Sequence, residues 1–349
     1  MKQLDYSTLA QPVTQSEMAV ELPHYRATVS ISGVFVVLGS AIAYMAAPDA
    51  WYFIAGFLLL VSALLIIAFR VQAKRVARIR RLAAANGLGF RNKVKDPGYK
   101  GIMYSIGRAR VLDEVLVFAD AQPPYEIGTY QYTTGSGKNT TVHYIGYVKL
   151  TLPRALPHIV LDGRRNNSFV GSNLPVTFDA SQRLSLEGGF DEHYTLYAPR
   201  EYKTDALYLF TPDVMAAFMD CGMAIDAEIV DNEMYIYIPL RLALDKQANI
   251  EAIMRLIDVL GGQLQKQGRN YRDERVVDPS VAAIAPAGAR LRRTINVWVY
   301  VAMALYVALC MGISANATDV QSSIVLLSGI AVVLVVGMYV TLHVRGKGK

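Results

Sequence analysis

Three stretches of the chain hold residue types that could do chemistry, and the first is the Gly-Ser-Gly-Lys run from Gly135 to Lys138. Its composition is that of the end of a phosphate-binding loop. Such a loop has a glycine five residues before the Gly-Lys pair and a hydroxyl residue after the lysine, but Tyr132 and Asn139 stand there instead. Both flanks alternate in polarity like strands, whereas a phosphate loop leads into a helix. We therefore expect a hairpin turn without a nucleotide.

This turn sets the register of the strands beside it. The expected hairpin has four facing pairs: Thr134 with Thr140, Tyr132 with Val142, Tyr130 with Tyr144, and Gly128 with Gly146. The register separates apolar from polar side chains on two faces, as a half-buried hairpin requires. Facing glycines indicate a bend, or the close approach of another backbone.

The second stretch is "LDGRR", in which Asp162, Arg164 and Arg165 lie close together in a loop. Guanidinium groups bind anions through charge-assisted hydrogen bonds, so these residues could form a ligand site. The third is "DEHY", in which Asp191 and Glu192 precede His193 and could act in acid–base chemistry. A polar turn is the alternative for each stretch. An alternative function, a membrane-bound enzyme or a sensor of small ligands, would use the residues of these two loops.

Histidine and cysteine give no further site. The 5 histidines include no two at the three- or four-residue spacing of helical metal ligands. The 2 cysteines, Cys221 and Cys310, fall on opposite sides of a membrane boundary in the topology derived below. We therefore expect no metal and no cofactor, and the catalytic residues, if there are any, stay unknown.

Four apolar blocks dominate the composition, in which 53% of the residues are hydrophobic and 18% are charged. They are residues 27–47, 51–69, 295–313 and 323–342. Each block is uncharged and close to the ~20 residues that cross a bilayer as a helix. The sequence thus predicts four transmembrane helices, two at each end. Because these blocks contain no aspartate, glutamate, lysine, arginine or histidine, a transporter component is a minor alternative.

Lysine and arginine predict the orientation of these helices. Basic residues follow the second block, precede the third and follow the fourth, whereas the loops near Asp49 and Asn316 contain none. By the positive-inside rule, both termini and the central segment are cytoplasmic, which predicts a multi-pass membrane protein. The expectation of a bacterial inner membrane comes from the resemblance described below. The net charge of +6 reflects this topology, so we expect no nucleic-acid partner.

The remaining residues divide into soluble segments. The divisions are an N-terminal segment 1–26, a basic helix and linker 70–94, an α+β domain 95–275, a linker 276–294 and a basic tail 343–349. We expect the second span to continue as a helix to Gly87, a favourable end residue. Its arginines could contact anionic lipid headgroups, or they could only fix the topology; the candidates are Arg75, Arg78, Arg80 and Arg81.

Inside residues 95–275 the pattern predicts antiparallel hairpins and two helices. Residues 211–222 form a short helix with Thr211 as N-cap and Pro212 at its first position. Residues 246–267 form a longer amphipathic helix. Between them, residues 225–238 alternate in polarity on both sides of Asp231 and Asn232, which predicts a hairpin with a turn at these two residues. The stretches "RVLDEVLVFAD", "HIVLDG" and "HYTLYAP" are further strands.

Residues from about 120 to 240 carry a family resemblance. The stretches "LPHIVLDG", "LSLEGGFDEHYTLYAPREYKTDALYLFTPD" and "DAEIVDNEMYIY" resemble a group of uncharacterised bacterial multi-pass membrane proteins with paired spans around a cytoplasmic domain. The resemblance implies a bacterial origin and this architecture, and it implies no activity, cofactor or site residue.

The function that these observations favour is a non-enzymatic one, since no set of residues converges on a reaction. We expect a cytoplasmic docking or scaffold domain presented at the membrane surface. Its partners would be a bilayer with anionic headgroups and either another protein or further copies of this chain. Exposed strand edges and tyrosines would then matter most for function.

Overall fold

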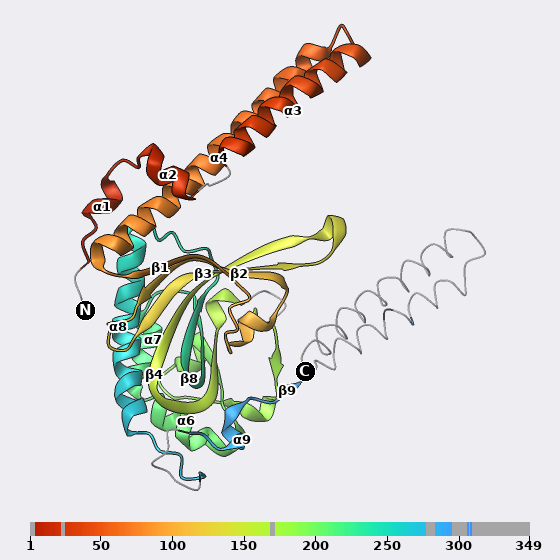
Figure 1. Cartoon of the computed structure of the whole chain (residues 1–349). Helices are drawn as coiled ribbons and strands as arrows, with labels where there is room; N and C mark the ends of the chain where they lie inside the picture. The colour runs from red at the N-terminus through yellow and green to blue at the C-terminus, as the bar shows by residue number, and fades with distance from the viewer. Residues whose placement is uncertain are drawn as a thin grey trace.

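The computed structural model describes residues 4–21, 25–167, 172–276, 283–294, 306 and 308. A helical hairpin projects from a body built around a strongly curved antiparallel sheet (Figure 1). The helices are α1 (Ser7–Ala10), α2 (Gln15–Glu21), α3 (Tyr25–Ala46), α4 (Trp51–Asn86), α5 (Phe190–His193), α6 (Lys203–Leu209), α7 (Pro212–Asp220), α8 (Gln247–Asn270) and α9 (Pro286–Ala289). The strands are β1 (Gly89–Lys95), β2 (Arg108–Phe118), β3 (Tyr125–Thr134), β4 (Thr141–Gly163), β5 (Thr177–Phe178), β6 (Arg183–Leu184), β7 (Tyr194–Tyr197), β8 (Asp226–Ile238) and β9 (Arg293–Thr294).

The main sheet has the strand order β1-β2-β3-β4-β7-β6, and β8 pairs with β4. Every one of these pairings is antiparallel, which confirms an α+β domain with an antiparallel sheet. The predicted helices 211–222 and 246–267 correspond to α7 and α8. Short 3₁₀ turns, of which Ile102–Ser105 is one, fill several of the connections.

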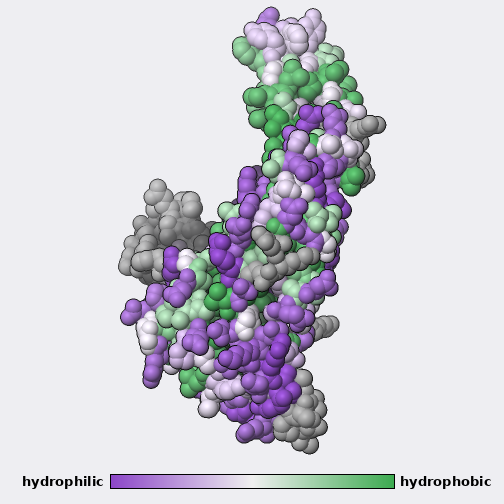
Figure 2. All heavy atoms as spheres, turned by 90° about the vertical axis from the view of Figure 1, so that its left-hand side faces the viewer, coloured by the Kyte–Doolittle hydropathy of each residue, from purple (hydrophilic) through white to green (hydrophobic). Residues whose placement is uncertain are grey.

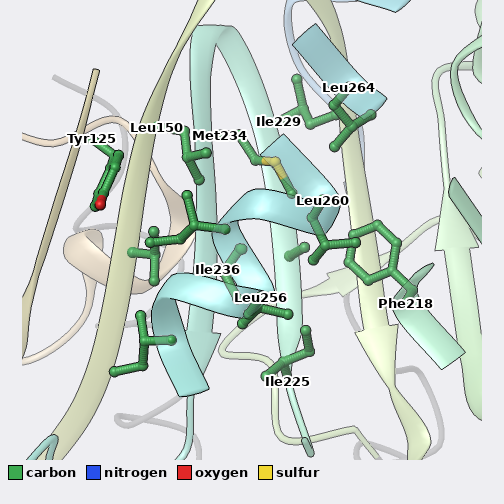
Figure 3. Close-up of a cluster of buried hydrophobic side chains, with 14 of the residues drawn as sticks. Tyr125, Leu150, Phe218, Ile225, Ile229, Met234, Ile236, Leu256, Leu260 and Leu264 are labelled. Atoms are coloured by element: carbon green, nitrogen blue, oxygen red, sulfur yellow. The ribbon is translucent and has the colours of Figure 1, made fainter. Parts of the chain in front are cut away.

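One face of the sheet packs against α8, α7 and the end of α4 to form the larger hydrophobic core. In Figure 3, Leu256, Leu260 and Leu264 of α8 face side chains of β4 and β8. Removing such side chains from water stabilises the fold by about 25 cal/mol per Å² of apolar area. The apolar face that the sequence predicts for α8 packs into this core.

The other face of the sheet carries a second core that is rich in tyrosine. Tyr104, from the 3₁₀ turn, lies at the centre of this core, with its ring edge-on to those of Tyr130 and Tyr147. Tyr235 and Tyr237 of β8 stack in parallel beside it. Because both faces are covered, most residues of β4 and β8 are buried regardless of their alternation.

The hairpin predicted around Gly135 is present, but its register is shifted by one residue. Tyr132 faces His143 and Thr134 faces Thr141, so the predicted pairing of Tyr132 with Val142 is wrong. Near the turn, most residues of the two strands are exposed or only partly buried. Strands without one buried face specify their register only weakly, and this is the physical reason for the error. Gly146 does admit another backbone, because its N–H donates to the carbonyl oxygen of Leu240.

The second predicted hairpin, residues 225–238, is also wrong. These residues form the single strand β8, and both halves of it pair with β4. Asp231 takes a left-handed conformation, with φ of 56°, inside the strand. The pairing register shifts opposite this residue, in the part of β4 that contains Pro153 and Pro157. The turn-forming residues therefore produce a bulge that bends both strands together.

The helices α3 and α4 are long and apolar enough to cross a membrane. Only 6% of the apolar window of α3 is buried inside the structure, and none of that of α4. They are therefore not core helices. Figure 2 shows hydrophobic side chains gathered on this hairpin above a mainly hydrophilic body. Apart from residues 306 and 308, the predicted spans 295–313 and 323–342 lie outside the described residues.

The helix α4 continues past its apolar part into the body, as the sequence predicts. It ends at Asn86, and Gly87 caps it in the left-handed conformation with φ of 66°. The predicted linker 276–294 differs from expectation, because residues 283–294 pack onto the body. Leu291 is buried in the second core, and β9 pairs with β5.

Candidate functional site

The junction between α4 and the sheet is an ion-pair cluster around Glu114 of β2. Arg75 of α4 lies 2.8 Å from this carboxylate, and Arg241 lies 3.2 Å from it. Gln72 of α4 also donates to Glu114, and Arg241 pairs with the neighbouring Asp113 at 2.8 Å. Arg75 further donates to the backbone carbonyl of Leu242. This cluster joins the apolar helix directly to the sheet domain.

Backbone geometry places Glu114 in this position. It has a left-handed φ of 55° at a register shift in β2, and such bulges redirect side chains. The Glu114 side chain is fully buried, and this burial raises its pKa while Arg75 and Arg241 lower it. Our sequence reasoning missed this site. Its signal was the pair of adjacent acids inside the apolar run "RVLDEVLVF".

Three of the four arginines that were predicted to contact lipid headgroups form ion pairs with acidic residues of this chain. Arg75 belongs to the Glu114 cluster, Arg80 pairs with Glu21, and Arg81 binds Glu17 through two nitrogens. Arg78 is partly buried. A contact with lipid at these positions would therefore compete with existing ion pairs, and Arg80, whose side chain is 47% exposed, is the most open of the three.

The N-terminal segment is held on α4 by the same arginines. Thr14 and Glu17 form reciprocal hydrogen bonds at the start of α2, which is a capping box. The hydrogen bonds from Arg81 and Thr14 lower the pKa of Glu17 to about 2. Asn86 closes the other end by bonding the backbone of Asp5 in both directions.

The structure separates the three side chains of the predicted anion site. Asp162 is only 3% exposed and faces the interior beside Asp226 of β8, whereas Arg164 and Arg165 lie at the surface. Asp226 is held by the backbone N–H of Gly163 at 2.9 Å.

Two asparagine side chains complete this polar cluster, since Asn166 and Asn173 donate to Asp226 at 2.8 and 3.0 Å. Burial and the nearby Asp162 raise the pKa of Asp226 to about 6, against the opposing hydrogen bonds. Burial also raises the pKa of Asp162. The arrangement fixes the ends of β4 and β8. Sequence reasoning assigned Asp226 to a polar face and missed its burial.

A second buried pair joins His158 of β4 to Glu228 of β8 at 2.9 Å. Glu228 also accepts from the hydroxyl of Tyr237 and from the backbone N–H of Ile102, each at 2.7 Å. The backbone N–H of Leu291 donates to Nδ1 of His158, so the ring proton must reside on Nε2 and point at Glu228. One ring nitrogen of His158 bonds Glu228 and the other bonds the backbone of Leu291. This pair therefore connects the second core to residues 283–294.

In the third predicted stretch, "DEHY", the side chain of Asp191 is used in local hydrogen bonds. Asp191 accepts from the hydroxyl of Ser185 and the backbone of Leu186. His193 lies near Arg165, and both line a hollow of about 50 Å³, which has room for about one or two water molecules. Among the described residues no group of three or more histidine, cysteine, aspartate or glutamate side chains gathers as a metal site. The two loops of the enzyme hypothesis thus meet at this small hollow.

Comparison with known proteins gives one weak likeness. No protein family model matches the chain, and no curated protein matches it. A crystal structure of the mycobacterial trehalose monomycolate transport factor A, TtfA, aligns with a TM-score of 0.35 and 12% sequence identity. The alignment covers 53% of this chain and 96% of that one. A likeness this low assigns neither fold nor function.

Proposed function

We propose that this chain is a non-enzymatic, multi-pass docking protein of the bacterial inner membrane, which holds its sheet domain rigidly at the cytoplasmic surface. The observation that carries the proposal is the continuity of α4. Its 36 residues extend about 54 Å at 1.5 Å per residue, and about half of this length is the apolar part. The rest enters the larger core, where Ile79 and Leu82 are fully buried.

The helical hairpin has the features of a membrane anchor. Its apolar side chains are exposed along both helices, which is stable only in an apolar surrounding. At its tip Tyr44 and Trp51 meet edge to face with their ring centroids 6.0 Å apart, and aromatic residues favour the membrane interface. Basic residues follow the apolar part of α4, which favours a cytoplasmic domain by the positive-inside rule.

The docking surface that we propose is the outer end of the hairpin between β3 and β4, residues 131–145, which we name the β-arm. It projects beyond the body in Figure 1. Among the described residues no strand pairs with the outer side of β4 before Gly146. An unpaired edge of this kind can accept a strand from another protein.

Side chains beside this edge suit a protein partner. Val142 and Tyr144 are 43% and 39% exposed, and Leu240 nearby is 54% exposed. The guanidinium of Arg241 lies 5.4 Å from the centroid of the Tyr144 ring, which links the β-arm to the Glu114 cluster. Docking here would therefore act on a surface fixed to the membrane helix. We propose an extended segment of a partner protein as the occupant.

Photo-crosslinking in living cells tests this proposal. A photoreactive amino acid replaces Tyr144, and the control replaces Val259 on α8, which is more exposed than Tyr144. We expect a discrete crosslinked protein from position 144 and none from position 259. A Val142→Lys substitution should abolish the product. A product of twice the mass of this chain would identify a second copy as the partner and correct the occupant that we propose.

Two results would overturn the proposal itself. One is extraction of the full chain from membranes by alkaline carbonate, because a chain with exposed spanning helices stays in the bilayer. The other is an absence of any crosslink from position 144 while the protein is present at its normal level.

A further inference from the structure

An apolar hollow lies between the end of α4, the turn from β2 to β3, and α8. Its volume is about 380 Å³, within the range of about 300–1,000 Å³ that small-molecule sites occupy. Leu88, Phe118, Tyr125, Met254 and Ile257 form its apolar lining. The rings of Phe118 and Tyr125 stack with centroids 4.4 Å apart, which provides a flat aromatic wall.

The charged residues that the structure describes in the lining of the hollow are acidic. Asp120 and Asp258 line it, and none of the lining residues that the structure describes is lysine, arginine or histidine. The end of α4 also opens into it through Gly87 and Leu88. The C-terminus of a helix carries a partial negative charge of about half an electron. The hollow therefore combines apolar walls with three sources of negative potential.

Gly262 of α8 lines the hollow without a side chain that would occupy it. A Cβ atom added at Gly262 of α8 would meet no atom within 4 Å, whereas one added at the neighbouring Gly261 would lie 2.9 Å from the Leu150 side chain. Packing thus explains Gly261 and does not explain Gly262. Glycine inside a helix costs about 1 kcal/mol relative to alanine. A residue that destabilises the helix and leaves a hollow unfilled is what a ligand site would require.

We propose that this hollow binds a small organic cation, an amine with an aromatic or aliphatic body. The apolar part would lie between Met254 and the stacked rings, and the ammonium would face Asp258 and Asp120. Such a ligand would touch both α4 and the sheet. This inference is independent of the docking role, since the hollow and the β-arm share no residues.

Tryptamine is the probe that tests the site, with full-length protein in nanodiscs of phosphatidylcholine. Binding is measured by isothermal titration calorimetry, with indole-3-acetate as the control of the same shape and opposite charge. We expect saturable binding of tryptamine, and binding of indole-3-acetate at least about tenfold weaker. Raising the salt from 50 mM to 500 mM should weaken tryptamine binding, because exposed carboxylates are screened.

Two variants locate the site. Gly262→Leu adds a large side chain at a lining residue whose Cβ position is open, so it should fold as the parent does and lose tryptamine binding. Lys266→Leu places the same side chain at an exposed position of α8 outside the hollow, and it should bind as the parent does. Asp258→Asn keeps the shape and should weaken binding about threefold to tenfold.

Three outcomes would overturn the proposal. They are an absence of saturable tryptamine binding up to 1 mM, equal binding of the two probes, and unchanged binding in a folded Gly262→Leu protein. A thermal unfolding scan of each variant establishes that it is folded.

Discussion

The carboxylate of Glu114 lies fully buried at the junction of α4 and the sheet, where Arg75 and Arg241 approach it. An unpaired charge at such a place would cost several kcal/mol, and its partners offset this cost only through close geometry. A left-handed backbone at a non-glycine residue adds a cost of order 1–3 kcal/mol. A strained and buried charge of this kind persists because the surrounding structure determines its position, and here it fixes how the helix meets the sheet.

The buried carboxylate of Asp226 predicts an unusual dependence of stability on pH. Its pKa is about 6 in the folded state, compared with about 3.9 in an unfolded chain. Since the folded pKa is the higher one, the protonated group stabilises the fold below pH 4, and this contribution disappears as the pH rises to 6. Its full size is about 3 kcal/mol at about 1.4 kcal/mol per pKa unit.

The Asp226→Asn substitution isolates this contribution. We expect the free energy of unfolding of the parent, minus that of the variant, to fall as the pH rises from 4 to 6 and then to stay constant. Urea unfolding in detergent micelles, followed by circular dichroism at several pH values, measures the difference. A difference that is flat between pH 4 and 6 would show that Asp226 titrates normally.

At the scale of the elements, the helices were predicted better than the strand pairings. The pattern of α8 has one apolar face because only one side of that helix is buried. The strands β4 and β8 are covered on both sides, so Asp226 and Glu228 are buried although they alternate with apolar residues. Alternation alone could therefore not settle the continuity of β8. Near Gly135 most residues of the strands are exposed or only partly buried, so polarity specified their register only weakly.

The continuity of α4 gives a prediction for the coupling of anchor and domain. Lys74 is exposed in the middle of this helix, and Lys74→Pro would break it there at a cost of about 3 kcal/mol or more. Spin labels on cysteines at positions 60 and 247, in a Cys221→Ser, Cys310→Ser background, report the distance between the apolar part and α8. We expect a narrow distance distribution in the parent and a broad one in Lys74→Pro.

Lys74→Ala is the matched control, because it removes the same charge and keeps the helix. Its distance distribution should equal that of the parent. A broad distribution in the parent chain itself would contradict the rigid coupling that we infer from the Glu114 cluster.

At the scale of the whole molecule, the positive-inside rule predicts which side each part faces. Asp49 lies between α3 and α4 in a loop without lysine or arginine, and Glu187 is an exposed residue of the sheet domain. In a protein whose two native cysteines are replaced by serine, Asp49→Cys should react with a membrane-impermeant maleimide in cells with a permeable outer membrane. Glu187→Cys should react only after the inner membrane is opened. The reverse pattern would place the sheet domain outside.

The sequence by itself determined the apolar blocks, the run of α4 into a basic helix that ends at Gly87, and the positions of α7 and α8. These features depend on residues near one another in the chain, so composition and periodicity are enough to predict them. The same local information recognised the Gly135 stretch as a turn between strands.

The tertiary structure decided which of the polar residues act together. Arg75 and Glu114, Asn166 and Asp226, and His158 and Glu228 are each brought together from distant positions. A buried charge is stable only beside its partner, and a linear sequence gives no distance between such residues. The hollow beside α8 likewise exists only where three elements meet. Long-range pairing therefore decided the sites, because their energies depend on contacts that no local pattern encodes.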